Sequence, residues 1–324
     1  MKKAPLWHLL AATLITLTAC NESNEITIEI DDEFGPHYRP ATEQSSDHFD
    51  RVYSYIPAPG QFINEQKTGG FNTPITSHAE ATAYAEDRLR AGNWVSLGAF
   101  GGYLVVGFDH SIRNSGGYDF TIMANSFAGS SEPGIVWVMQ DENGNGEPDD
   151  VWYELKGSES DKATCLRNYS VTYFRPSAPQ QAVEWTDSFG NTGQVLYMAQ
   201  FHNQDYYYPA WIETDSYTLT GTKLTTNTDD PTQSDNGLWQ NKAYEWGYAD
   251  NFSPVDRLSN NANMGGGNNS PNHFKISNAI KADGSAAELK FIDFVKIQSA
   301  MLTQSGPLGE VSTEVCGISD DHCF

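Results

Sequence analysis

Positively charged residues are scarce in this chain of 324 residues. Lys and Arg together number 19 against 42 Asp and Glu, which gives a formal net charge of −23 at pH 7. Binding to nucleic acid and electrostatic binding to an anionic membrane both require a basic surface. The composition therefore argues against both classes of partner.

The sequence also lacks the short motifs that mark common enzyme classes. It has no HExxH zinc motif, no GxSxG nucleophile motif, no P-loop and no GxGxxG opening a helix. The neighbours Asp109 and His110 suggest half of a catalytic dyad, and Asp109, Asp119 and Glu132 suggest a paired-carboxylate site. Adjacency in sequence does not bring two side chains into hydrogen-bond reach, so we expect a protein that is not an enzyme.

Long apolar runs are missing except at the N-terminus. Met1-Lys2-Lys3 is followed by an apolar stretch from Leu6 to Thr18, shorter than the ~20 residues of a membrane helix. The stretch ends in Leu17-Thr18-Ala19-Cys20, which resembles the lipobox of bacterial lipoproteins. We therefore predict a signal peptide over 1–19 and a lipid on Cys20, with an ordinary secretory signal as the alternative.

The residues after Cys20 indicate the destination of the chain. Asn21 differs from the Asp usually associated with inner-membrane retention, which favours an outer-membrane lipoprotein. The acidic residues Glu22 and Glu25 are compatible with display on the cell surface. We predict an acidic, flexible spacer over 20–50, with one short strand possible at 26–30, and a folded ligand-binding domain over 51–324.

Cysteines are few, with four in the whole chain and no CxxC pair. Cys20 is assigned to lipid, and Cys316 and Cys323 enclose a short loop near the C-terminus. In the oxidising cell envelope a disulfide between Cys316 and Cys323 is expected, and Cys165 is then a buried small hydrophobic residue.

Short strands dominate the pattern. Only one segment predicts a helix, near 78–91, with Ser77 as N-cap and Glu80 completing a capping box. Runs rich in β-branched and aromatic residues, separated by Gly, Asn, Asp or Pro, predict strands at 103–108, 119–123, 134–139, 152–155, 169–174, 195–198, 211–219, 274–276 and 289–298. No βαβ alternation is visible, so we expect an all-β, antiparallel, jelly-roll-like β-sandwich with long loops and one short helix.

The segment DENGNGEPDD, from Asp141 to Asp150, has the spacing of a calcium loop. Oxygen-bearing side chains occupy positions 1, 3 and 5, glycine occupies position 6 and an acid occupies position 9. The predicted metal ligands are Asp141, Asn143, Asn145, Glu147 through its carbonyl, Asp149 and Asp150. Trp152 replaces the bidentate Glu of an EF-hand, so we expect an EF-hand-like loop with structural Ca²⁺, or alternatively a metal-free turn.

Two stretches combine aromatic side chains with amides. One runs from His202 to Trp211, and the other includes Trp239, Tyr244, Trp246 and Tyr248. Aromatic faces with Asn and Gln between them suit flat ligands that carry hydrogen-bonding groups on their rims, although alternate aromatics in a sandwich are also core residues. The candidate ligand-binding residues are His202, Tyr206, Tyr207, Tyr208, Trp211 and Trp246.

Several longer segments carry a resemblance. They are YIPAPGQFIN from Tyr55, VSLGAFGGY from Val95, SSEPGIVWVMQDENGNGEPDD from Ser130, WYELKGSE from Trp152, FIDFVKIQSAM from Phe291 and GEVSTEV from Gly309. Together these segments span most of the chain from Arg51 onward. With them the chain resembles a family of bacterial cell-surface lipoproteins related to the surface cobalamin-binding lipoproteins of vitamin-uptake loci. The resemblance transfers no individual ligand-binding residue.

That resemblance implies a tethered protein that captures cobalamin and passes it to an outer-membrane transporter. A corrin is a broad apolar disc rimmed with amides, which agrees with the aromatic and amide content of the two stretches. A calcium-stabilised carbohydrate-binding module and an adhesive surface protein require the same residue types, and both remain open.

Overall fold

The computed structural model describes residues 34–258 and 270–323. The predicted signal peptide over 1–19, Cys20 and the first part of the predicted spacer lie outside these ranges. No helix within them has the length and apolar character needed to cross a membrane.

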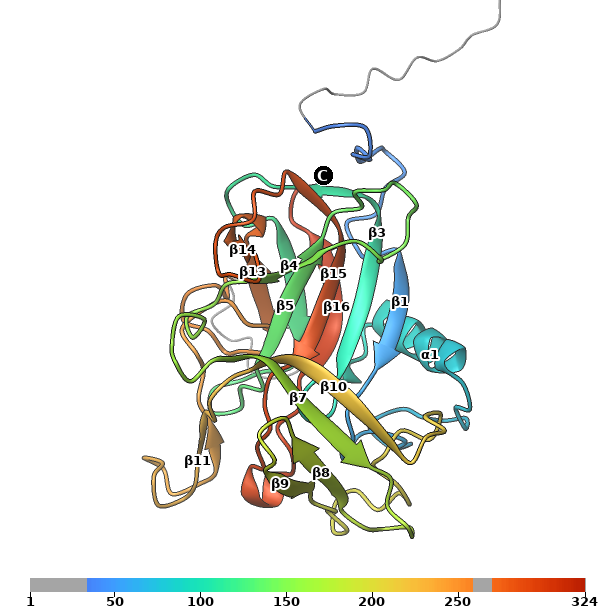
Figure 1. The fold of residues 1–324 in the computed structure, drawn as a ribbon, viewed down its shortest axis with the longest axis vertical. Coiled ribbons are helices and arrows are strands. Elements are labelled where there is room, and N and C mark those ends of the chain that lie inside the picture. The colour runs from blue at the N-terminus through green and yellow to red at the C-terminus, as the bar shows by residue number, and fades with distance from the viewer. Residues whose placement is uncertain (1–33, 259–269, 324) are drawn as a thin grey trace, which may run out of the picture.

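A six-stranded antiparallel sheet forms the centre of the molecule (Figure 1). Its order is β1 (Arg51–Ile56), β3 (Tyr103–Arg113), β15 (Phe291–Ser299), β5 (Gly134–Met139), β6 (Trp152–Leu155) and β14 (Ala279–Ile280). The central strand β15 pairs with β3 on one side and β5 on the other, and nearly all of its residues are buried. A strand covered on both faces buries polar as well as apolar residues, and in FIDFVKIQS Asp293, Gln298 and Ser299 are buried among the apolar side chains.

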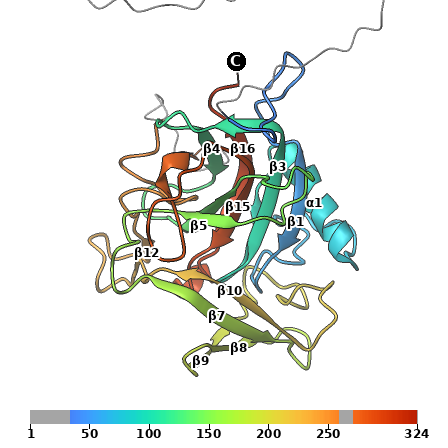
Figure 2. The same ribbon diagram turned by 45° about the horizontal axis from the view of Figure 1, so that its top comes forward.

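A second antiparallel sheet packs against the first. It contains β13 (Ser270–Phe274), β4 (Phe120–Ala124), β16 (Glu314–Asp320) and β2 (Val95–Ser96), and β4 and β16 lie behind β5 and β15 in Figures 1 and 2. Leu104 and Val106 of the central sheet share one hydrophobic core with Ile122 and Ile318 of the second. The two sheets form an antiparallel β-sandwich, which confirms the predicted fold class.

A third sheet lies below the sandwich in Figure 1. Its order is β10 (Ser216–Lys223), β7 (Leu166–Phe174), β8 (Val183–Asp187) and β9 (Thr192–Val195), and a two-stranded ribbon of β11 (Thr228–Asp229) and β12 (Gln240–Asn241) accompanies it. Gln298 of β15 joins this sheet to the sandwich, because its amide donates to the carbonyls of Gly101 at 2.8 Å and Thr220 at 3.1 Å. Two short 3₁₀ helices, η1 (Ile276–Asn278) and η2 (Gly306–Leu308), complete the described elements.

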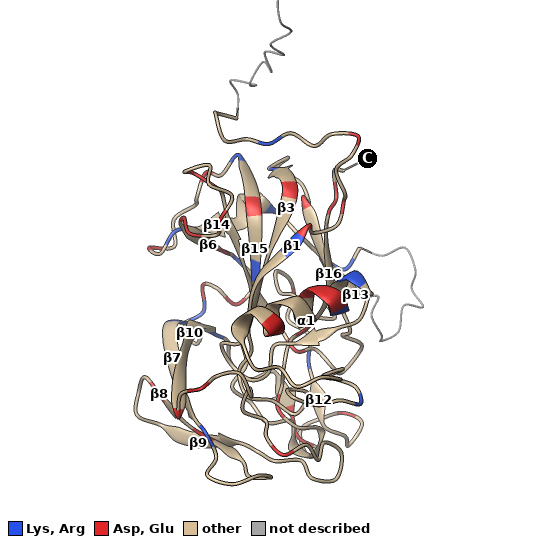
Figure 3. Ribbon diagram, turned by 90° about the vertical axis from the view of Figure 1, so that its right-hand side faces the viewer, with Lys and Arg blue, Asp and Glu red and all other residues tan. Residues whose placement is uncertain are grey.

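The helix α1 (His78–Arg90) follows the prediction closely. The Ser77 hydroxyl accepts the Glu80 N–H at 3.2 Å and caps the first turn. The buried face of α1 consists of Ala81, Ala85 and Leu89, and it packs against β1. This arrangement leaves the opposite face of α1 at the surface of the molecule (Figure 3).

Some predicted strands agree with the structure in their bounds, and others differ. Those at 134–139 and 152–155 are confirmed with their bounds. The strand predicted at 195–198 ends at Val195, and the one predicted at 211–219 begins at Ser216. Of the strand predicted at 274–276, only Phe274 lies in a strand, and Ile276 begins the helix η1. The prediction missed β1, β8 and β16, and β16 carries acids and a glycine that interrupt a hydrophobic pattern.

The described part of the predicted spacer is folded. Arg39 forms an ion pair with Asp293 at 3.0 Å, Phe49 is buried, and the Tyr38 ring meets the edge of Phe291 at 5.3 Å. Residues 34–50 therefore belong to the folded body, which corrects the spacer boundary. The physical reason is that Asp293 is a fully buried acid on β15 that needs polar partners.

The predicted disulfide between Cys316 and Cys323 is not formed, and both thiols are free. Cys316 lies near the start of the extended strand β16, and Cys323 follows its end. A strand advances about 3.3 Å per residue, whereas bridged cysteines need Cα atoms within about 7 Å. The extended backbone of β16 therefore keeps the two thiols apart.

Candidate functional site

Three of the predicted ligand-binding aromatics are core residues. Tyr207 and Tyr208 are 0% exposed and Trp211 is 2% exposed. Tyr207 donates its hydroxyl to the His202 carbonyl at 2.8 Å, and Tyr208 donates to the Thr214 carbonyl at 2.9 Å. The two tyrosine hydroxyls are satisfied inside the protein, and all three side chains are buried, so these three residues do not form a ligand-contacting surface, which corrects the prediction.

The other three predicted residues do not form one site. His202 is half-buried, and its ring stands edge-on to Phe62 with centroids 4.7 Å apart. Tyr206 is also half-buried, and its carbonyl accepts from the Asn64 amide at 2.9 Å. Trp246 lines a separate pocket of about 240 Å³ beside Tyr118.

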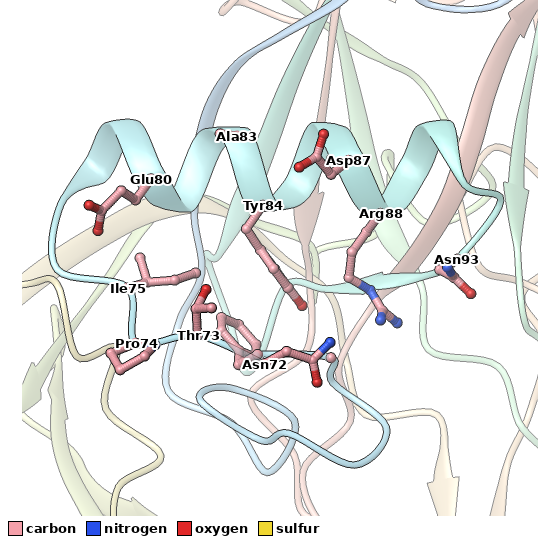
Figure 4. Close-up of a pocket in the computed structure, with 12 residues that line it drawn as sticks. Asn72, Thr73, Pro74, Ile75, Glu80, Ala83, Tyr84, Asp87, Arg88 and Asn93 are labelled. Carbon is pink, nitrogen blue, oxygen red and sulfur yellow. The ribbon is translucent and has the colours of Figure 1, made fainter.

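A larger groove lies between α1 and the loop that precedes it (Figure 4). Its volume is about 650 Å³, within the usual range for ligand sites. Tyr84 and Arg88 point from the helix toward the loop residue Asn72 in Figure 4. The lining residues are Gly70, Phe71, Asn72, Thr73, Pro74, Ile75, Glu80, Ala83, Tyr84, Asp87, Arg88 and Asn93.

The floor of this groove is aromatic and fixed. Phe71 stacks on Tyr84 with ring centroids 4.1 Å apart, and Trp211 stacks beneath Phe71 at 5.9 Å. Tyr84 donates its hydroxyl to the Gly69 carbonyl. Burial raises the pKa of Tyr84, so its hydroxyl stays neutral at ordinary pH. Part of the predicted aromatic run thus supports the floor of the groove from below.

The rim of the groove is polar. Asn72, Thr73, Asp87 and Asn93 are exposed, so amide, hydroxyl and carboxylate groups surround the aromatic floor. Arg88 is held in place because its Nε donates to the Trp94 carbonyl at 2.8 Å. An apolar floor with a hydrogen-bonding rim suits a flat ligand that carries polar groups on its edge.

No pattern in the sequence predicts this groove directly. Its aromatic floor joins residues from two neighbouring segments, and neither Phe71 nor Tyr84 lies in an aromatic run. One feature of the groove that the sequence does contain is the glycine at position 70. In the structure Gly70 has φ +77°, and a Cβ at this position would collide with the Arg88 guanidinium. Only glycine adopts this conformation at little cost while allowing such an approach.

The predicted calcium loop brings four of its six candidate residues together. The buried Asp141 carboxylate accepts the N–H groups of Gly144 at 2.7 Å and Gly146 at 2.8 Å. The side-chain amides of Asn143 and Asn145 both donate to Asp149, at 3.0 Å to its nearer oxygens. Asp141, Asn143, Asn145 and Asp149 thus line one side of the turn.

The remaining two candidates have other roles in the structure. Asp150 accepts the N–H groups of Glu142 at 2.8 Å and Asn143 at 3.2 Å, and the Glu147 carbonyl accepts the Asp149 N–H at 2.9 Å. The segment 141–150 contains no Lys or Arg, so its carboxylates meet no local cation within it. The oxygen-rich donor set fits a hard cation such as Ca²⁺, with Asp141, Asn143, Asn145 and Asp149 as the residues that would hold it.

The suggested catalytic pairs take structural positions. The His110 ring is 1% exposed and lies between Asp109, at 2.6 Å, and Asp320, at 2.9 Å, so both ring nitrogens are engaged. The bond to Asp320 is the largest of the influences that raise the pKa of His110. Asp119 accepts the Ile276 N–H at 2.8 Å, while Glu132 lies beside other acids, so the three suggested carboxylates do not converge.

A scan against protein-family models and a search of curated protein sequences find no match for this chain.

Proposed function

We propose that this protein is a lipid-anchored surface protein that captures a small organic ligand in the groove beside α1 and does not transform it. Cobalamin is the ligand that we propose first. The observation that carries the proposal is the stacked floor of Phe71 and Tyr84 enclosed by an exposed polar rim. We propose that the apolar corrin face contacts the aromatic floor and that its amide rim forms hydrogen bonds with Asn72 and Asn93.

The lipobox-like sequence supports the tether. We propose that Cys20 carries the lipid, that the protein faces outward from the outer membrane, and that an outer-membrane transporter receives the ligand. A Cys20→Ser variant should then be released in soluble form. A native protein that incorporates no labelled fatty acid would contradict the tether.

We further propose that the loop from Asp141 to Asp150 binds structural Ca²⁺. The Asp141 N–H donates to Asp293 of β15 at 2.8 Å, so the loop is anchored to the central sheet. An ion held by this loop would stiffen a turn that contacts β1 as well, because Tyr53 donates its hydroxyl to the Gly146 carbonyl at 3.0 Å. Its role is therefore to stabilise the fold at a position away from the groove.

Titration calorimetry with cyanocobalamin, beside a panel of polysaccharides, tests the ligand. The variant Asn72→Trp places a bulky ring in the groove without removing a core residue, because Asn72 is exposed. We expect this variant to bind cyanocobalamin at least about tenfold more weakly, a loss of about 1.4 kcal/mol. The matched control Asn203→Trp makes the same change at an exposed position in the aromatic run, and it should bind like the wild type.

Each alternative result has a defined meaning. Heat with a polysaccharide and none with cyanocobalamin would overturn the cobalamin proposal and support the carbohydrate-binding alternative. Weaker binding in Asn203→Trp together with unchanged binding in Asn72→Trp would move the site from the groove to the aromatic run.

A further inference from the structure

Three acidic side chains from distant parts of the chain meet inside the molecule. Glu132 precedes β5, Asp250 follows the β11–β12 ribbon, and Glu314 begins β16. One carboxylate oxygen from each lies within 4.8 Å of the others. Asp250 is 0% exposed and Glu314 is 1% exposed, while Glu132 is partly exposed. We call these three residues the acidic cluster.

The backbone of the acidic cluster is fixed by hydrogen bonds. The Glu132 N–H donates to the Asp250 carbonyl at 2.9 Å, and the Glu314 N–H donates to Asp250 Oδ2 at 2.8 Å. Asp250 also adopts φ +53°, a left-handed conformation that costs free energy for a residue other than glycine. A side-chain hydrogen bond joins Glu132 to Glu314, and burial raises the pKa of Glu132 and of Asp250, so the structure holds three acidic groups together at close range.

One oxygen of the acidic cluster has no partner. Asp250 Oδ1 is buried and accepts no hydrogen bond from the described residues. A buried carboxylate oxygen without a partner is costly, and native proteins satisfy nearly all such atoms. This atom is an observation independent of the acidity of the site, and it points to a missing electropositive partner.

No protein cation supplies that partner. Within the described ranges, none of the three carboxylates forms an ion pair with Lys, Arg or His. The nearby neutral groups are oxygen donors, since the Ser312 hydroxyl donates to Glu314 Oε1 at 2.6 Å and contacts the Ser96 hydroxyl at 2.9 Å. The surroundings are thus rich in hard oxygens and poor in positive charge.

We propose that the acidic cluster of Glu132, Asp250 and Glu314 binds a divalent cation, Ca²⁺, at the junction of the central and second sheets. Ca²⁺ binds oxygens at 2.3–2.6 Å, so two ligands on opposite sides of it lie about 4.6–5.2 Å apart. The mutual limit of 4.8 Å in the cluster fits one such ion. This site is separate from the loop at 141–150 and from the groove, and it does not rest on the proposed function.

Counting bound calcium in the full-length chain tests the proposal. The protein is stripped with chelator, dialysed against ⁴⁵Ca²⁺ and measured in two backgrounds, the wild type and the loop variant Asp141→Ala with Asn145→Ala. The loop variant isolates the acidic cluster, and we expect it to retain one Ca²⁺ per chain. Adding Glu314→Gln to the loop variant should remove that ion. Adding Glu154→Gln, a change at another buried acid, should leave it bound.

The test remains decisive if Glu314→Gln misfolds, because the count on the loop variant needs no change in the cluster. A loop variant with no bound Ca²⁺ would overturn the proposal, as would one Ca²⁺ retained in folded Glu314→Gln. Asp250→Asn gives a second measurement. Without an ion, this change relieves repulsion and raises the melting temperature, whereas with an ion it abolishes the rise in melting temperature that calcium gives the loop variant.

Discussion

Replacement of Asp293 by Ala should destabilise the protein strongly, because one buried carboxylate on β15 joins three separate segments. It accepts hydrogen bonds from the Ser111 hydroxyl of β3 at 2.6 Å, from the Asp141 N–H of the loop at 141–150 at 2.8 Å, and from the Arg39 guanidinium of the N-terminal segment at 3.0 Å. Asp293 itself is 0% exposed, so water does not replace these bonds in the folded protein. Asp293→Ala therefore leaves three donors without their acceptor.

The magnitude follows from the burial of each donor. A buried donor left unsatisfied costs about 1–3 kcal/mol, which applies to the Ser111 hydroxyl and the Asp141 N–H. The Arg39 side chain is 39% exposed, so its ion pair contributes only about 1 kcal/mol or less. The two buried donors together cost about 2–6 kcal/mol and the ion pair adds up to about 1 kcal/mol, so the free energy of unfolding should fall by about 2–7 kcal/mol in Asp293→Ala.

Urea unfolding followed by tryptophan fluorescence measures this change. Asp283→Ala is the matched control, because Asp283 is an exposed acid whose bonds are to Ser285 within its own turn. Arg39→Ala should cost about 1 kcal/mol or less. A loss below about 0.5 kcal/mol in Asp293→Ala, the usual size for a surface substitution, would refute the reasoning.

Three further changes are testable by thermal melting. Asp141→Ala with Asn145→Ala should remove the loop's share of the stabilisation by calcium, about 2.7 kcal/mol at 100-fold the Kd of the loop, and leave the share that the acidic cluster gives. A calcium-dependent rise in melting temperature that is as large in this variant as in the wild type would contradict the loop site. The pKa of His110 is raised in the folded state, so its contribution to the free energy of unfolding is fully present below the unfolded-state pKa of 6.5 and is lost as the pH rises through the folded-state pKa. His110→Gln should remove this pH dependence. Burial lowers the pKa of Lys296 from 10.5 to about 8, so the free energy of unfolding rises as the pH increases between these two pKa values. Lys296→Met removes the buried charge and should stabilise the protein at pH 7 by about 1–3 kcal/mol, and a lower melting temperature of this variant would contradict the prediction.

Strands with a local hydrophobic signal could be predicted from the sequence. The residues of β5 are apolar or aromatic after its first glycine, those of β6 are so except for Glu154, and the bounds of both strands were predicted correctly. The strand β16 could not be found in this way, because Glu314 and Asp320 lie at its ends and are buried by contacts with distant segments. Burial of an acid depends on tertiary partners, which a local pattern does not contain.

The candidate sites show the same difference. The residues of the proposed calcium loop are close in sequence, so their spacing alone was enough to identify Asp141, Asn143, Asn145 and Asp149 as candidates. The aromatic run at 206–211 had the composition of a binding surface, but composition does not say which side of a ring faces the core. Tyr207 and Tyr208 point inward because their hydroxyls find carbonyl acceptors there.

The two proposed calcium sites differ in what the ion contributes. In the loop, backbone N–H groups already satisfy both oxygens of Asp141, so the turn is complete as a hydrogen-bonded structure and the ion adds stability by mass action. In the acidic cluster, Asp250 Oδ1 has no partner among the described residues, so the ion satisfies an atom that the fold leaves unpaired. Exchange at the cluster requires local opening between the sheets, because Asp250 and Glu314 are buried, whereas exchange at the loop does not. Calcium should therefore leave the loop quickly and the cluster slowly when chelator is added.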